Sequence, residues 1–380
     1  MKKFDWAYYL YLVTGLLGGR FWWLKKKVHI ASSEQRQETS KIFDQQFAWD
    51  YWQKNLAKVP AATRLVKIEQ KIFKKKIGHF NISGVIRYRL YFINRDGQEE
   101  NCDYFFSAST DNNRYQSYLL MKHLARANFG SKIVVVATAV DYLKTQQCLI
   151  YRGVPGETMH ELLLSDAANK TALIKLAAQW LKYWHQLSSA DYQDIDLANG
   201  YLYLSSPQAS RSCYLLAETF PRWGKIAKEL ITRQVYYEKK FWPRKKSIVH
   251  GDYQLENLII NSDRNSAGMV DLTDVVIGNP YRDLGTFIQQ LGFMLRLYHP
   301  KQQIYNWKRI FLEEYFGCPY EQIKITDFQQ INLYQSWTAW RSALYIFLMK
   351  GAKSLVVELL KDSQKYLQLV EQNKKTVNIK

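Results

Sequence analysis

Three oxygen-bearing side chains near the middle of the chain have the types and spacing that phosphoryl transfer requires. Asp252 ends a His-Gly-Asp motif, Asn257 comes five residues later, and Asp271 follows a second short apolar run. Magnesium is a hard ion that takes oxygen ligands, a few from protein and the rest from phosphate and water. Asn257 and Asp271 could hold it, which leaves Asp252 to accept the proton of an attacking hydroxyl. The pattern predicts transfer of a nucleotide γ-phosphoryl group to a hydroxyl.

A β-rich island over residues 247–271 must position these side chains. Its first apolar residues lead into the loop that carries Asp252. The polar stretch 261–265 is turn-like, so residues 258–261 and 267–272 are expected to pair as a hairpin. That hairpin would bring Asn257 and Asp271 to the same end.

The flanking patterns predict an α+β fold with two lobes. Strand-like residues and one Asp-Gly hairpin turn precede Gly153, and helical spacing follows it. We expect strands over 64–80, 84–94, 101–110, 133–139 and 148–152, with a loop over 141–146. We expect helical segments over 39–56, 113–127, 157–164, 170–187, 210–240, 281–297, 301–316 and 327–372, and those after residue 156 contain breaks that the pattern does not place closely.

These elements form a small antiparallel β-lobe with one helix and a large, mainly helical lobe, with a cleft at the junction. The expected domains are a basic, aromatic-rich helical extension over 1–60, a small nucleotide-binding lobe over 61–152 and a large lobe over 153–380.

The island resembles the aminoglycoside phosphotransferase and choline kinase family, which has the protein-kinase-like fold. His250-Gly251-Asp252 with Asn257 is similar to its catalytic loop, and Asp271 to its metal-binding aspartate. The resemblance implies Asp252 as base, Asn257 and Asp271 as Mg²⁺ ligands, and ATP or GTP as donor. We interpret His250 as a supporting residue of the loop.

Two further motifs extend the resemblance. Residues 278–285 are similar to the family's G-D-P-x-x-D-L-A element, which implies that Asp283 braces the catalytic loop. Asn279 stands where the family often has Asp. Residues 149–156 resemble the interlobe strand, which implies nucleotide binding by Tyr151, Arg152 and Gly153. The resemblance covers about residues 64–350.

The sequence departs from the family where nucleotide phosphates are gripped. The family has a lysine on the third strand, held by a glutamate on the next helix. Here Ser107 stands about where the lysine is expected, and the helix over 113–127 has no glutamate. Either another basic residue substitutes, or the chain is a kinase-like pseudo-enzyme or binding protein. The candidate substitutes are Lys74, Lys75, Lys76, Arg87 and Arg89.

The charge is strongly basic and uneven. The net charge is +19, and residues 1–76 hold 16 Lys and Arg against 6 Asp and Glu, a net +10. Such an end attracts anionic lipid, nucleic acid or phosphorylated substrates, unless it is simply a solvated surface. Residues 4–24 are rich in aromatic residues and are interrupted by Asp5 and Arg20. This segment could be a packed helix, an interfacial membrane anchor, or a signal or membrane-spanning segment.

From this we predict a cytoplasmic protein with an anionic membrane surface as a candidate partner of residues 1–30. No nucleic-acid module is recognised, so nucleic acid is the weaker partner. The four cysteines are far apart without a C-x-x-C pair, which argues against a disulfide scaffold or a zinc site.

Acceptor choice is expected to lie in the helical lobe, around residues 188–246. The family's acceptors suggest an amino sugar, a sugar or a choline-like alcohol, and the basic balance weighs against a polycationic antibiotic. The sequence leaves the acceptor, ATP versus GTP and the oligomeric state open.

Overall fold

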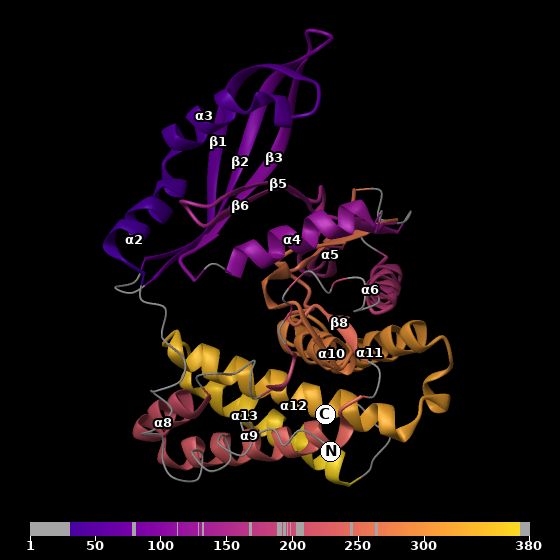
Figure 1. Ribbon diagram of the computed structural model, residues 1–380. Coiled ribbons are helices and arrows are strands. Elements are labelled where there is room, and N and C mark those ends of the chain that lie inside the picture. The colour runs from indigo at the N-terminus through magenta and orange to yellow at the C-terminus, as the bar shows by residue number, and fades with distance from the viewer. Residues whose placement is uncertain are drawn as a thin grey trace, which may run out of the picture.

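The computed structural model places an antiparallel sheet at one end of the molecule and layers of helices at the other (Figure 1). It describes residues 31–77, 81–111, 113–127, 129–130, 133–166, 169–187, 192, 195, 197, 199–202, 209–243, 246–262 and 265–372. Residues 1–30, the candidate membrane-binding segment, lie outside this set. Within the set, no helix is both long and apolar enough to cross a bilayer.

The small lobe is a five-stranded antiparallel sheet with the strand order β1-β2-β3-β6-β5. Its strands are β1 (Ala62–Ile77), β2 (Ile82–Asn94), β3 (Glu99–Ser109), β5 (Thr138–Leu143) and β6 (Cys148–Arg152). Burial alternates at every residue of β2, as period-2 side-chain placement requires when one face meets a core. The predicted hairpin turn joins β2 to β3, with Gly97 at φ 79°.

Two strand expectations were wrong. The expected loop over 141–146 starts later, because β5 continues to Leu143. Strand β4 (Val134–Val136) does not join the small-lobe sheet but pairs in parallel with β10 (Ala267–Met269). The register of so short a strand is set by a partner more than 130 residues away, which local pattern does not report.

The outer face of the sheet is covered by α2 (Ser33–Ser40) and α3 (Gln45–Lys54), which lie along it in Figure 1. Trp52 of α3 is fully buried, with its ring 4.4 Å from that of Tyr104. The single helix expected over 39–56 is divided at Asp44. This residue has extended backbone and caps α3 by accepting the N–H of Gln46 at 2.8 Å.

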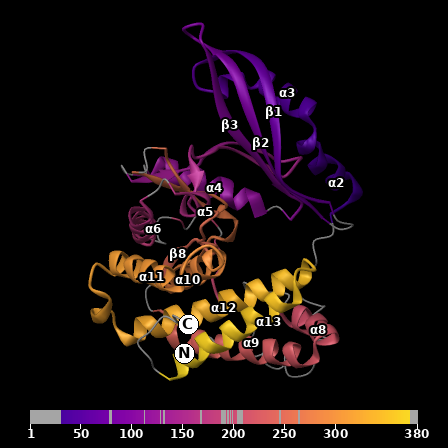
Figure 2. The same ribbon diagram turned by 180° about the vertical axis from the view of Figure 1, so that it is seen from behind.

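The large lobe is mainly helical, and Figure 2 shows its helices from behind. They are α5 (Met159–Leu164), α6 (Lys170–Trp184), α8 (Ala209–Thr219), α9 (Pro221–Phe241), α10 (Tyr281–Leu295), α11 (Lys301–Phe316), α12 (Ile325–Leu348) and α13 (Lys353–Glu371). The stretches 210–240 and 327–372, expected to be helical with unplaced breaks, are each two helices. Pro221 starts α9, where its missing N–H costs nothing, and Lys350 at φ 58° with Gly351 ends α12.

Between the sheet and these helices lie short strands and one helix that carry the candidate site. Helix α4 (Asn113–Arg126) packs against β5, β6 and the 3₁₀ turn η5 (Leu272–Asp274).

The predicted hairpin is confirmed as β9 (Leu258–Ile260) with β10, in a sheet of order β4-β10-β9-β7. Strand β7 (Glu157–Thr158) takes the first two residues expected in the helix over 157–164. Strands β8 (Ser247–Val249) and β11 (Val276–Gly278) form a separate pair. The predicted fold class is thus confirmed.

Candidate active site

One buried carboxylate fastens the loop that carries Asp252 to the start of α10. Asp283, in the first turn of α10, accepts the backbone N–H of His250 at 2.7 Å and that of Gly251 at 2.9 Å. Its Oδ2 also lies 3.0 Å from Nε2 of His185. Burial raises the pKa of Asp283, but the contacts with His185 and the backbone N–H groups outweigh burial and leave the pKa below its ordinary value. The carboxylate is therefore charged at neutral pH.

His250 joins the loop to the strand that leads into Asp271. Its Nδ1 lies 3.4 Å from the backbone nitrogen of Asp252, and its Nε2 lies 3.2 Å from the carbonyl oxygen of Val270. These contacts fit the ring tautomer in which Nε2 carries the proton and donates it to the carbonyl. The fully buried ring thus ties the two candidate acidic residues to one frame.

The Asp252 carboxylate is held on both oxygens. Oδ2 accepts hydrogen bonds from Nε2 of Gln254 at 3.0 Å and from Nδ2 of Asn257 at 3.1 Å. Oδ1 lies 3.5 Å from Nη2 of Arg341. Burial raises the pKa of Asp252 above its ordinary value, although Arg341 opposes the rise. The side chain still exposes 23% of its surface, so an incoming hydroxyl can reach it.

Asp271 turns the chain from β10 into η5 with a left-handed backbone, at φ 57° and ψ 61°. Asp is one of the few residue types that tolerate this region. Its Oδ1 accepts hydrogen bonds from the Thr273 hydroxyl at 2.6 Å and from Nη1 of Arg114 at 3.3 Å. The Asp271 side chain exposes 46% of its surface. Burial of the group raises its pKa, but Arg114 and Thr273 outweigh burial and lower the pKa.

These atoms fit a magnesium ion. The side-chain nitrogen of Asn257 donates hydrogen bonds to the carboxylate and to the backbone carbonyl of Asp252. The side-chain oxygen of Asn257 is thus available to a metal ion. Oδ2 of Asp271 accepts no hydrogen bond from the described residues. No group of three His, Cys, Asp or Glu side chains in the described part of the chain could hold a metal. An ion here would complete its coordination with phosphate and water, as magnesium usually does.

Two arginines at the site were missed by the sequence analysis. Arg341 of α12 contacts Asp252 and also donates to Oδ2 of Asp274 at 3.1 Å. Arg114 of α4 contacts Asp271. The partners are 67 to 157 residues away in sequence, so no local pattern could have indicated either contact.

A family model now places the chain among known proteins. The model of APH, a phosphotransferase enzyme family, matches residues 105–308, more than half of the chain. The chain belongs to this phosphotransferase family.

Solved structures show a similar fold. Plasmodium vivax ethanolamine kinase superposes with a TM-score of 0.56 at 13% identity, over 92% of this chain and 98% of that one. The GDP and kanamycin complex of APH(2")-IIia superposes with a TM-score of 0.51 at 14% identity, over 83% of this chain and 98% of that one. At these identities the likeness concerns the fold, and it confirms the predicted protein-kinase-like architecture.

A curated relative matches over a shorter stretch. The 1-deoxy-D-xylulose 5-phosphate reductoisomerase of Aquifex aeolicus (strain VF5) is 26% identical over 168 residues. That match spans 42% of this chain and 42% of the relative.

Of the residues predicted to bind nucleotide, Tyr151 and Arg152 end strand β6, and Gly153 follows them. The Tyr151 ring stacks on Phe105 with centroids 5.3 Å apart, and the backbone nitrogen of Gly153 donates to the carbonyl of Asp103 at 3.3 Å. A Cβ on Gly153 would meet the Phe105 ring at 2.4 Å. Arg152 is exposed. Nucleotide binding by these residues stays a prediction.

The family's strand lysine has no counterpart in the described small lobe. Ser107 is buried between Val85 of β2 and Leu149 of β6. Among the suggested substitutes, Arg89 donates twice to Asp103, at 2.7 and 2.9 Å, so it is already neutralised.

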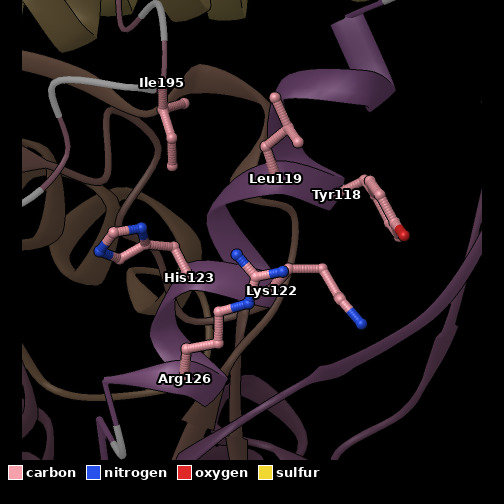
Figure 3. A pocket seen from close by; sticks show the side chains of 6 residues that line it. All are labelled: Tyr118, Leu119, Lys122, His123, Arg126 and Ile195. Atoms are coloured by element: carbon pink, nitrogen blue, oxygen red, sulfur yellow. The ribbon is translucent and has the colours of Figure 1, made fainter.

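Two cavities among the described residues lie away from Asp252. One, of about 210 Å³, is lined by residues of α10, α11 and α13, including the buried Lys308. The other, of about 110 Å³, opens on α4 (Figure 3). It is lined by Tyr118, Leu119, Lys122, His123, Arg126 and Ile195.

Proposed function

We propose that this chain transfers the γ-phosphoryl group of ATP or GTP to a hydroxyl group of a small molecule. Asp252 is the base, and Asn257 and Asp271 hold magnesium. One observation carries the proposal: Asn257 donates to Asp252, while His250 bridges Asp252 to the residue before Asp271. A potential base and two potential metal ligands thus share one rigid frame, as positioning catalysis requires.

In the proposed reaction the acceptor oxygen attacks the γ-phosphorus while its proton passes to the Asp252 carboxylate. The bond between the γ-phosphorus and the bridging oxygen breaks, and ADP or GDP leaves with the bonding electrons. Bound magnesium would neutralise charge on the phosphates. Gln254 and Asn257 hold the carboxylate in one orientation, and its raised pKa makes it a better proton acceptor than an exposed aspartate.

The acceptor class we propose is an amino sugar, a sugar or a choline-like alcohol. Family membership supports it, and two structures of the same fold are those of an ethanolamine kinase and of a kanamycin complex. The retained acidic residues favour an active enzyme over a pseudo-enzyme.

The test is transfer of labelled γ-phosphate from ATP and GTP with MgCl₂. The acceptor panel contains kanamycin, choline, ethanolamine, homoserine and glucosamine. We expect Asp252→Asn to lower the transfer rate at least about 100-fold while keeping nucleotide-induced thermal stabilisation. Asp271→Asn should lose the magnesium-dependent part of that stabilisation.

The matched control is Asp96→Asn, in the β2–β3 turn, which should change neither measurement. A wild-type chain that neither ATP nor GTP stabilises, with or without magnesium, would refute the proposal and favour a kinase-like binding protein.

A further inference from the structure

We propose that Arg114 binds the nucleotide phosphates in place of the missing strand lysine. The inference rests on the proposed function and names a binding residue for it. Phosphoryl transfer needs fixed positive charge beside the phosphates, because charge neutralisation supplies much of the catalysis. Ser107 cannot supply that charge.

Arg114 is buried beside the candidate metal ligand Asp271. It lies in the first turn of α4, with 5% of its surface exposed, and its Nη1 is 3.3 Å from Oδ1 of Asp271. The neighbouring Ser117 fixes the helix there by donating to the carbonyl of Leu272 at 3.1 Å. The guanidinium therefore lies against the candidate metal ligand, at the turn to which α4 is fixed.

One hydrogen-bond donor of the Arg114 guanidinium is also unused by the described residues. Its Nε is buried and has no hydrogen-bond partner in the described part of the chain. Leaving an N–H of a buried cation unsatisfied is costly, so such groups call for a ligand or another explanation. An arginine fork matches two phosphate oxygens at once, whereas a lysine offers a point charge.

The other cations of the small lobe fit the role less well. Arg87 and Arg89 both face Asp103, at 3.7 and 2.7 Å. Lys75 lies over the Phe43 ring at 4.9 Å, beside the outer helices. The side chain of Lys74 is exposed on β1. Arg114 alone of these combines burial with direct contact to Asp271.

The test is calorimetric titration with ADP and with adenosine, in MgCl₂ and in EDTA. We expect Arg114→Met to weaken ADP binding at least about tenfold in both buffers, because a charge-assisted contact is lost. Adenosine has no phosphate, so its affinity should change less than twofold. Arg114→Lys keeps the charge and should recover part of the ADP affinity.

The matched control is Arg126→Met, on the same helix about 18 Å further along and beside the pocket of Figure 3. It should leave both affinities unchanged. An equal loss of ADP and adenosine affinity, or an unchanged ADP affinity in Arg114→Met, would overturn the assignment. Failure of the wild-type chain to bind either ligand would instead refute the proposed function, and this assignment with it.

Discussion

At the scale of single residues, Glu238 is a carboxyl group buried in the large lobe. It lies in α9 with 1% of its surface exposed, and both of its oxygens accept the backbone N–H of Leu202, at 3.1 and 2.9 Å. The Tyr334 hydroxyl lies 3.4 Å away. Burial raises the pKa of Glu238 from 4.5 to about 8, despite these contacts and the charge of Arg282.

This raised pKa makes stability depend on pH. Between pH 4.5 and 8 the folded chain keeps a proton on Glu238 that the unfolded chain has lost, so stability falls as pH rises through that window. Glu238→Gln has nearly the same shape and stays neutral. We expect it to flatten the pH dependence and to raise the free energy of unfolding at pH 7.5 by up to about 4 kcal/mol.

Urea unfolding at pH 5, 6.5 and 8 checks this expectation. Glu99→Gln, at an exposed position of β3, is the control, and its stability should change with pH as that of the wild type does. A wild-type stability that rises steadily from pH 5 to 8, unaltered in Glu238→Gln, would contradict the assignment of a protonated Glu238.

At the scale of elements, the turn at Gly251 decides how the loop that carries Asp252 meets η5. Gly251 has φ 84°, and a Cβ there would meet the backbone oxygen of Asp274 at 2.1 Å. Backbone atoms cannot yield as a flexible side chain can. We expect Gly251→Ala to cost more than about 1 kcal/mol of stability and to abolish most phosphoryl transfer, because the loop must move away from η5.

A second glycine separates backbone strain from crowding. Gly97 has φ 79°, but a Cβ there would meet nothing within 4 Å. Gly97→Ala should therefore cost about 1 kcal/mol and leave transfer unchanged. Unfolding and transfer assays on both variants make the comparison. Equal transfer rates in the two variants would show that the Gly251 turn does not position Asp252.

Local pattern predicted the elements whose causes are local. The β9–β10 hairpin and helix α11 formed over nearly the predicted residues, because turn residues and helical spacing specify them. Breaks inside the long helical stretches were expected but not placed, and they lie at Pro221 and at Lys350, although Pro221 was a visible signal. The parallel pairing of β4 and the contacts of Arg114 depend on residues far away in sequence, so the sequence alone could not predict them.

At the scale of the whole molecule, the helices before β1 form part of the small-lobe core. Trp52 packs on Tyr104 and Phe106, with ring centroids 4.4 and 6.2 Å away, and is fully buried. Trp52→Ala would leave a large cavity under the sheet, so we expect it to cost about 3 to 5 kcal/mol. Chemical unfolding measures the loss, and ADP titration should show weakened binding if the sheet distorts.

Tyr236→Ala, with 59% of the ring exposed on α9, is the control and should change stability by less than about 0.5 kcal/mol. A cost below about 1 kcal/mol for Trp52→Ala would mean that residues 33–54 add little to the lobe and form an independent extension.

Contacts between residues far apart in sequence have a consequence for the order in which the protein forms during synthesis. Arg114 meets Asp271 across 157 residues, and β4 pairs with β10 across a similar stretch. A ribosome releases the small-lobe strands well before residues 267–272 emerge. During that interval Arg114 lacks Asp271 and β4 lacks β10, the partners that they have in the folded chain. The candidate site can therefore form only after synthesis has passed Asp271.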